Sequence, residues 1–264
     1  MLELVLLSVQ QQNVNDAGLA QDIEIIIADD GSASKTKDLI ESFQKDFPFK
    51  LIHVWHPDNG FQLAAIRNLA VTKSSGEYLV FIDGDCVLPP DFLLQQMKLA
   101  EVGYFVAGNR VLLSQNYTQY MLKSKDINIA KSGVIGAIWH KLRGHINKFL
   151  ATLRLTPTAS WRKWRQHNWR YPKGCNIGVW RNDYFAVNGF DASFSGWGHE
   201  DSDFFVRLFH LGVFAKDGRF AVPVFHLWHP DAKRDNAGSN WQKFMQRVHD
   251  PKVIRAEIGI EQHA

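Results

Sequence analysis

Three acidic residues stand close together in the stretch GWGHEDSDFF, residues 196–205. Glu200, Asp201 and Asp203 follow a Gly-Trp-Gly turn and precede apolar residues at helical spacing. Negative side chains stabilise the first turn of a helix, because its free N–H groups and its dipole carry positive charge. Helix capping explains one or two of these carboxylates but not the glycines on both sides of Trp197. Capping alone therefore does not account for the stretch, and its partners must be sought elsewhere in the chain.

Two further acidic motifs end predicted strands. Asp29 and Asp30 follow the apolar run IEIIIA, and Asp83 and Asp85, with one glycine between them, end the run EYLVFID. In an open parallel sheet, ligands bind beyond the carboxyl ends of the strands. Two carboxylates around a glycine can converge on Mg²⁺ or Mn²⁺, which would bridge to a diphosphate. Taken alone, Asp-Gly-Asp fits a solvated turn slightly better, but its place after a buried strand favours the cation.

Two histidines, His226 and His229, lie three residues apart at the end of another apolar run, in FHLWH. Imidazole is an ordinary ligand of Mn²⁺ and Zn²⁺. A packed or surface histidine explains either residue equally well when it is taken singly. Together with Asp85, however, these histidines predict a cation held by a carboxylate and an imidazole, close to a base from the acidic helix.

The elements that position these motifs alternate in the first third of the chain at the spacing of a parallel α/β sheet. Helices are predicted at 2–12, 35–47, 61–72 and 89–102, and strands at 23–28, 49–55, 77–83 and 104–113. After residue 174, strands are predicted at 175–180 and 219–229, and helices at 182–187 and after residue 197. This order predicts an α/β protein with an open, mostly parallel sheet flanked by helices.

The middle of the chain, residues 116–173, lacks this alternation. It holds twelve Lys and Arg against one acidic residue, although the net charge of the whole chain is only +3. Apolar residues from Val134 to Leu153 recur at spacings of three and four with basic residues opposite, which predicts a basic amphipathic helix. An anionic membrane surface, contacted through residues 134–170, and an acidic polysaccharide both fit this pattern, as does plain packing on the sheet. The acidic remainder argues against nucleic acid.

Composition sets the broad class. The chain has 264 residues, 45% of them hydrophobic, and nine tryptophans, which indicates a globular protein. Its two cysteines, far apart in sequence, argue against a disulfide scaffold and a cysteine zinc site, and favour a reducing compartment. Neither a run of 18 apolar residues nor a secretory signal is found in the chain as given. We expect a cytoplasmic protein, either free or peripheral on the inner face of the cytoplasmic membrane.

Together these motifs resemble known enzymes. IIIADDGS, followed by NGFQLAAIRNLAVTKSSGEYLVFIDGDC, is similar to the nucleotide-binding half of GT-A family 2 glycosyltransferases. GWGHEDSDFFVRLFHLG, followed by FHLWH, resembles the acceptor half of β-1,4-galactosyltransferases, polypeptide N-acetylgalactosaminyltransferases and bacterial chondroitin-type polymerases. The resemblance implies a GT-A fold in three parts. These are a nucleotide-sugar half at 1–113, a basic helical insertion at 114–173 and an acceptor-binding and catalytic half at 174–264.

The resemblance implies a metal-dependent, inverting glycosyltransferase that moves a sugar from a UDP-sugar to a glycan or lipid-linked glycan in bacterial surface polysaccharide synthesis. The donor-binding residues it implies are Asp29, Asp30, Arg67, Asn68, Asp83 and Gly84. The implied ligands of Mn²⁺ or Mg²⁺ are Asp85, His226 and His229. The implied acceptor-binding residues are Trp197, Gly198 and Glu200. Asp201 would be the catalytic base.

One departure from the family leaves a second hypothesis open. The family begins with an apolar strand that forms a wall of the uridine pocket, whereas this chain begins in the helix expected to follow that strand. The chain could therefore be a catalytically silent or truncated glycan-binding or scaffold protein of the same fold. The presence of Asp83, Asp85, Asp201 and both histidines favours the enzyme. A nucleotide-sugar hydrolase would instead release UDP without an acceptor.

Overall fold

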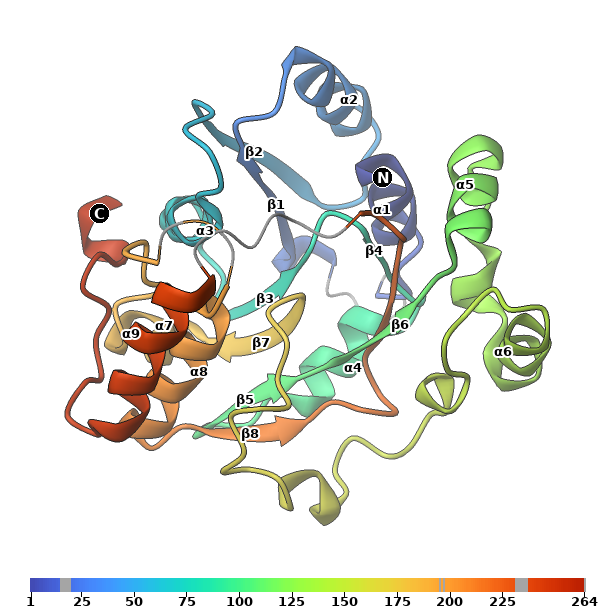
Figure 1. Cartoon of the computed structure of the whole chain (residues 1–264). Coiled ribbons are helices and arrows are strands. Elements are labelled where there is room, and N and C mark those ends of the chain that lie inside the picture. Colours follow the sequence, from blue (N-terminus) through green and yellow to red (C-terminus); the bar gives the residue numbers. More distant parts are fainter. Residues whose placement is uncertain (15–19, 195, 197, 231–236, 264) are drawn as a thin grey trace. The chain divides into compact units, whose positions relative to one another are not determined.

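The computed structural model describes residues 1–264 except 15–19, 195, 197, 231–236 and 264 (Figure 1). The chain divides into two compact units, each assembled from three separate stretches. Unit 1 comprises Met1–Leu19, Val80–Val179 and Ala215–Pro230. Unit 2 comprises Ala20–Leu79, Trp180–Phe214 and Asp231–Ala264. None of the helices in the described parts of the chain is long and apolar enough to cross a bilayer.

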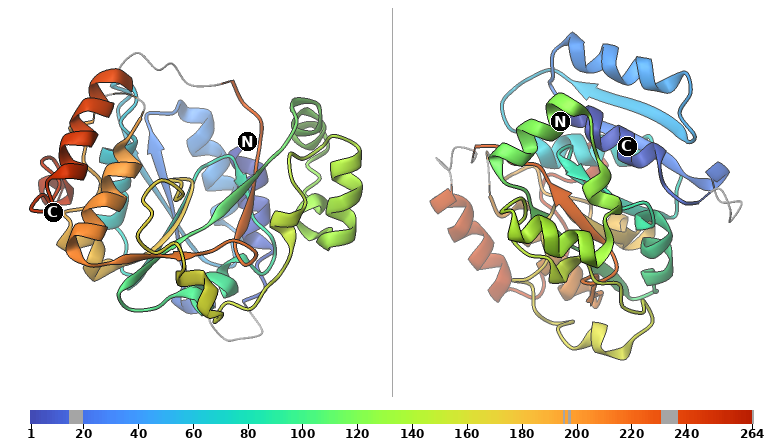
Figure 2. Two further views of the ribbon diagram at one scale, coloured as in Figure 1. Left: turned by 60° about the horizontal axis from the view of Figure 1, so that its bottom comes forward. Right: turned by 90° about the vertical axis from the view of Figure 1, so that its right-hand side faces the viewer.

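Unit 2 is built on two parallel strands, β1 (Glu24–Asp30) and β2 (Lys50–His56), in a register that pairs Asp30 with His56. Parallel strands need a crossover, and α2 (Ser34–Gln44) supplies it. Helix α3 (Leu63–Thr72) packs against both strands. The unit also contains α7 (Arg181–Ala186), α8 (Glu200–Leu211) and α9 (Ala237–His249), and α8 and α9 lie side by side (Figures 1 and 2). Helix α9 was not predicted from the sequence.

Unit 1 contains most of a sheet in the order β3-β7-β5-β8 and a smaller sheet in the order β4-β9-β6. The first sheet comprises β3 (Tyr78–Ile82), β7 (Asn176–Trp180), β5 (Tyr104–Ala107) and β8 (Phe214–Asp217). The second comprises β4 (Cys86–Val87), β9 (Pro223–His226) and β6 (Asn109–Leu112). Strand β6 runs parallel to β9, whereas the β4–β9 and β5–β7 pairs are antiparallel.

The α/β class predicted from the sequence is confirmed, but the described strands form three sheets where one mostly parallel sheet was expected, and the β4–β9 and β5–β7 pairs are antiparallel. The strand expected at 104–113 is divided at Gly108. A Cβ at this position would overlap the buried side chain of Asn176. The Asn176 amide reaches past Gly108 and donates to the carbonyls of Asn109 (3.2 Å) and Val222 (2.7 Å). A partner 68 residues away in sequence thus ends one strand and starts the next.

Four helices complete unit 1: α1 (Leu2–Gln10), α4 (Phe92–Leu99), α5 (Gln115–Ser124) and α6 (Gly133–Leu142). Its core includes a cluster of buried apolar side chains from α1, the β4-β9-β6 sheet and the basic segment, among them Leu4, Val87, Val111, Met121, Ile129, Ala137, Ile146 and Leu227. Helices α5 and α6 lie side by side in every view (Figures 1 and 2).

The long amphipathic helix expected from Val134 to Leu153 is shorter than predicted. Helix α6 ends at Leu142, and Gly144 follows with a left-handed φ of 71°. The chain then turns back to β6, where Ser114 donates to the carbonyl of His145 (2.9 Å) and Asn147 to that of Leu112 (3.0 Å). Short 3₁₀ turns at Leu150–Thr152 and Ser160–Lys163 continue the segment. Glycine in the left-handed region ends a helix without steric cost, which explains the early end.

Candidate functional site

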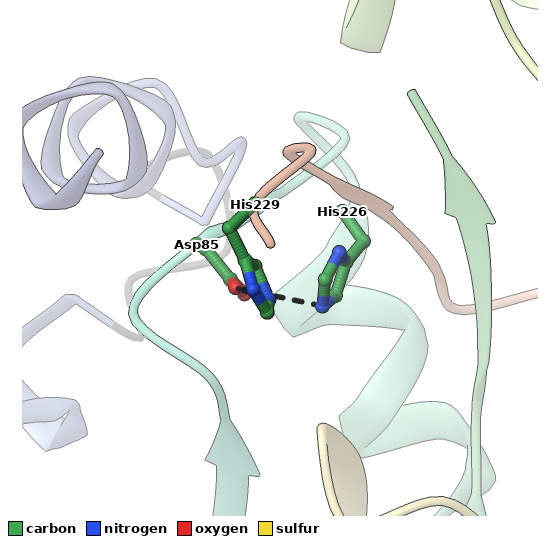
Figure 3. Close-up of side chains that lie close together, drawn as sticks. All are labelled: Asp85, His226 and His229. Carbon is green, nitrogen blue, oxygen red and sulfur yellow. Dashed lines mark ion pairs between the residues drawn. The ribbon is translucent and has the colours of Figure 1, made fainter. Parts of the chain in front are cut away.

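A carboxylate and two imidazoles converge in unit 1 (Figure 3). Asp85 lies in the turn between β3 and β4, His226 ends β9, and His229 follows three residues later. The antiparallel β4–β9 pair sets Cys86 opposite His226 and so brings Asp85 beside both histidines. Asp85 Oδ2 lies 3.1 Å from His229 Nε2 and 3.5 Å from His226 Nε2. One ligand atom from each residue lies within 4.8 Å of the other two, as expected for ligands of one ion.

The surroundings of both histidines suit them to bind a cation. Burial lowers the pKa of His226 and outweighs the attraction of Asp85, so the neutral imidazole with its free lone pair is favoured. The Nδ1 atom of His229 lies 2.8 Å from the carbonyl oxygen of Pro230. A proton on Nδ1 would make this hydrogen bond and leave the lone pair of Nε2 directed at Asp85. One carboxylate oxygen and two imidazole nitrogens suit Mn²⁺ or a similar transition metal.

Asp83 and Gly84 form the turn that precedes this cluster. The carbonyl of Asp83 accepts a hydrogen bond from the Cys86 N–H (3.1 Å), and the Asp83 side chain is half-buried. Gly84 is exposed, its φ lies outside the left-handed region, and an added Cβ would meet nothing within 4 Å. The conformation of the turn therefore does not require glycine at this position.

In unit 2, each aspartate at the end of β1 meets a histidine of β2. Asp29 is 5% exposed, accepts from the Ser32 N–H (2.9 Å) and lies 2.8 Å from His53 Nε2. Burial raises the pKa of Asp29, but the hydrogen bonds of Ser32 and His53 outweigh it, so the pKa lies below its ordinary value. These internal partners hold Asp29 within the fold.

Asp30 is the more accessible aspartate of the pair, with 22% of its side chain exposed. Its Oδ1 lies 2.6 Å from His56 Nε2, and its Oδ2 accepts from the Gln62 N–H (2.8 Å). Sequence analysis missed His53 and His56. The available signal was two histidines in the strand directly after the one that ends in Asp29-Asp30.

Arg67 and Asn68, expected beside the donor, are both buried in α3. Asn68 Oδ1 accepts from the Tyr184 hydroxyl (2.6 Å) and the Phe190 N–H (2.9 Å), and its Nδ2 donates to the Phe190 carbonyl (2.8 Å). The structure thus gives Asn68 a role in tying α3 to residues 184–190, and its contact with a donor stays a prediction. The Arg67 guanidinium lies over the Phe190 ring at 5.0 Å.

A cavity of about 270 Å³ lies in unit 2 between residues 59–65 and residues 192–200. Phe61, Phe194 and Glu200 are among the residues that line it, and the first turn of α3 forms part of its wall. Asp201 is not among the described lining residues, and its Oδ1 accepts from the Ser202 N–H at 2.6 Å. Trp197, an expected acceptor-binding residue, lies outside the described residues. Gly198, also expected there, has a φ of 117°, and its N–H donates to Glu200 Oε2 (3.1 Å).

The three carboxylates at the start of α8 have different environments. Burial, followed by the negative charge of Asp201, raises the pKa of Glu200 to about 7. Asp201 is half-buried. Asp203 is fully buried and pairs with Arg207 (2.7 Å) and Arg247 (2.7 Å). Asp203 therefore serves the fold, whereas the functional roles expected of Glu200 and Asp201 stay predictions.

Comparisons with known proteins show the family of this chain. Residues 1–177 match the family described as glycosyl transferase family 2, and residues 155–223 match the N-terminal domain of galactosyltransferase. Chondroitin synthase of Escherichia coli is 27% identical over 259 residues, which cover 91% of this chain. The chain spans 36% of the length of that relative.

Two solved structures resemble the chain at 12% sequence identity. The structure of GalNAc-T7 with UDP, GalNAc and Mn²⁺ has a TM-score of 0.57. The match covers 90% of this chain and 44% of the GalNAc-T7 chain. The structure of S. aureus TarS residues 1–349 in complex with UDP has a TM-score of 0.59. The match covers 98% of this chain and 63% of the TarS chain. At this identity the likeness bears on the fold alone, and it confirms the predicted GT-A fold.

Proposed function

We propose, from the premise that the chain belongs to glycosyl transferase family 2, that it transfers a sugar from a UDP-sugar to a hydroxyl of a glycan or lipid-linked glycan, with inversion. Family membership confirms the resemblance predicted from the motifs. The observation that carries the proposal is the convergence of Asp85, His226 and His229 at the end of β9. The E. coli relative, a chondroitin synthase, supports a glycan acceptor and a role in polysaccharide synthesis.

We assign Mn²⁺ to the Asp85, His226 and His229 cluster, because the donor set and the Nδ1–Pro230 hydrogen bond of His229 fit a transition metal. A cation bound there would neutralise the charge that develops on a departing diphosphate. Asp83, two residues earlier, would contact the ribose or the sugar. The exposed backbone at Gly84 would let the donor approach closely.

We assign recognition of the uracil to Asp30. Its carboxylate can accept a hydrogen bond from the uracil N3–H, and it is the more accessible of the two aspartates. His56 and the Gln62 N–H would hold the carboxylate in place. Asp29 would support the loop through Ser32 and His53 without a direct contact with the base.

We assign removal of the acceptor proton to Asp201 and binding of the acceptor to Glu200. Two neighbouring carboxylates with different environments can divide such roles between them. Glu200 lines the cavity, and its raised pKa of about 7 lets it donate or accept a hydrogen bond near neutral pH. During inversion the base and the leaving diphosphate act on opposite sides of the sugar carbon, and a carboxylate within hydrogen-bond reach of the acceptor hydroxyl would take its proton.

Transfer from a panel of radiolabelled UDP-sugars to chondroitin-type and cell-envelope glycan fractions tests the assignment. The wild type is expected to label one acceptor class and Asp201→Asn to label it at least about 100-fold more slowly, with UDP binding intact in both. Release of UDP by the wild type at equal rates with and without acceptor would favour a hydrolase. Bound UDP without turnover of any donor would favour the silent glycan-binding protein.

A further inference from the structure

Helix α6 carries its large apolar side chains on the outside of unit 1. Ile135, Ile138, Trp139 and Leu142 follow one another at spacings of three, one and three residues, and so form one stripe, here called the α6 stripe. Ile135 is 86% exposed, Leu142 82%, Trp139 46% and Ile138 39%. The buried residue of the helix is the small Ala137. A helix packed on a core normally shows the reverse arrangement, so the exposed stripe calls for a partner.

The α6 stripe stands on a well-packed base. His140 Nδ1 lies 2.9 Å from His145 Nδ1, and the ring of Tyr117 from α5 stacks on His145 with a centroid distance of 4.3 Å. The Trp139 ring meets the His140 ring edge to face at 5.0 Å. These contacts fix the orientation of α6 against α5, so the apolar side chains are held outward by the fold of unit 1.

The surroundings of the stripe are strongly basic. Between Asp126 and Asp183 the sequence contains eleven Lys and Arg and no acidic residue. Lys131, Lys141 and Arg143, which precede or end the helix, are exposed and form no ion pair with any described residue. The Arg143 guanidinium lies 4.2 Å from the centre of the Trp139 ring, so an indole and a cation are presented together.

We propose that the α6 stripe docks on the surface of a lipid bilayer that contains anionic lipids. Its four apolar side chains enter the boundary between headgroups and acyl chains, and Lys131, Lys141 and Arg143 meet the lipid phosphates. A ten-residue helix is about 15 Å long, which suits a position in the plane of the interface and not across the bilayer. A second copy of the chain fits less well, since two such basic surfaces repel each other.

This surface does not depend on the proposed function, but it agrees with it. A protein held at the inner face of the cytoplasmic membrane would meet acceptors that are linked to lipids. The α6 stripe would be the surface through which the protein takes up the peripheral membrane location expected from the sequence.

Co-sedimentation with vesicles tests the proposal. The full chain is expected to bind phosphatidylcholine vesicles that contain phosphatidylglycerol at least about tenfold more tightly than vesicles of phosphatidylcholine alone, and to be released by added salt. The double variant Ile135→Glu/Leu142→Glu is expected to lose about tenfold or more of this binding. Both positions are more than four-fifths exposed, so the fold should persist, as circular dichroism and UDP binding would verify.

Val102→Glu is the matched control, because Val102 is 83% exposed in unit 1 and lies outside the basic segment. It is expected to bind the anionic vesicles like the wild type. Equal vesicle binding by the double variant and the wild type would overturn the proposal. So would a dimer in analytical ultracentrifugation that the double variant abolishes, since the stripe would then serve self-association.

Discussion

His56 lies directly opposite Asp30 across the β1–β2 pair, and its Nε2 atom is 2.6 Å from Asp30 Oδ1. Because Asp30 is the proposed uracil acceptor, we expect His56 to act through it as a positioning residue. His56→Ala should weaken UDP binding about tenfold, the cost of one hydrogen bond to a charged group. His56→Gln, which can still donate a hydrogen bond, should restore most of the affinity.

Calorimetry with UDP measures the effect of both His56 variants. Lys50→Ala is the control, since Lys50 pairs with Glu24 at the exposed start of the same two strands. Equal losses in His56→Gln and His56→Ala would mean that His56 serves the strand and not the carboxylate.

The raised pKa of Glu200 makes stability depend on pH. The pKa rises from 4.5 in the unfolded chain to about 7 in the folded protein, so the folded state binds this proton more tightly. The resulting stabilisation is fully present below pH 4.5 and is lost as the pH rises through 7. Glu200→Gln should therefore be more stable than the wild type at pH 8, by about 3 kcal/mol.

Urea unfolding of both proteins at pH 5 and pH 8 measures this difference. Between these two pH values, the free energy of unfolding should change less in Glu200→Gln than in the wild type. The same pH dependence in both proteins would show that the Glu200 pKa is not raised.

The two carboxylates at the start of α8 should also differ in their effects on the reaction. Asp201→Asn should lower kcat by about 10²–10⁴-fold, the usual contribution of a general base, and leave UDP affinity unchanged. Glu200→Gln should mainly raise KM for the acceptor. Steady-state kinetics at saturating donor separates the two, and a larger loss of kcat in Glu200→Gln would transfer the role of base to Glu200.

Arg247 should be essential for the stability of unit 2. Its guanidinium pairs with two fully buried carboxylates, Asp191 and Asp203, each at 2.7 Å. Arg247→Met would remove the positive charge between them and should destabilise the protein by about 3–5 kcal/mol. Thermal unfolding tests this expectation, with Arg255→Met, which removes an exposed arginine from the same unit, as the control. Equal melting temperatures for the two variants would contradict it.

Much of the fold could be predicted because its signals are local. The apolar runs and their periodicity located β1, β2, β3 and the helices between them to within a few residues. The division of the strand at Gly108 depends on Asn176, which is distant in sequence. The early end of α6 depends on the hydrogen bonds that join the residues after the helix to β6. Periodicity also marked the α6 stripe as apolar, but it could not tell which face of the helix would meet the core.

The candidate site likewise contains residues that could be predicted from the sequence and residues that could not. Asp85 and the two histidines lie at or within three residues of the end of a strand, so their positions in sequence were enough to bring them together as a hypothesis. The His56 partner of Asp30 follows from the register of β1 and β2, which a single sequence does not contain. The resemblance gave roles to Glu200 and Asp201 but none to Asp203, whose part in the fold became visible only when the structure placed Arg207 and Arg247 beside it.

The central claim is that Asp85, His226 and His229 hold a cation that binds the UDP portion of a donor. Calorimetry of UDP binding with and without Mn²⁺ tests this claim most directly. The proteins compared are the wild type, Asp85→Ala and the control Asp91→Ala. Asp91 is a suitable control because its carboxylate pairs with Arg154 on the surface of the same unit. We predict binding that requires Mn²⁺, is lost in Asp85→Ala and is retained in Asp91→Ala. Binding of equal strength without Mn²⁺ or in Asp85→Ala would contradict the account.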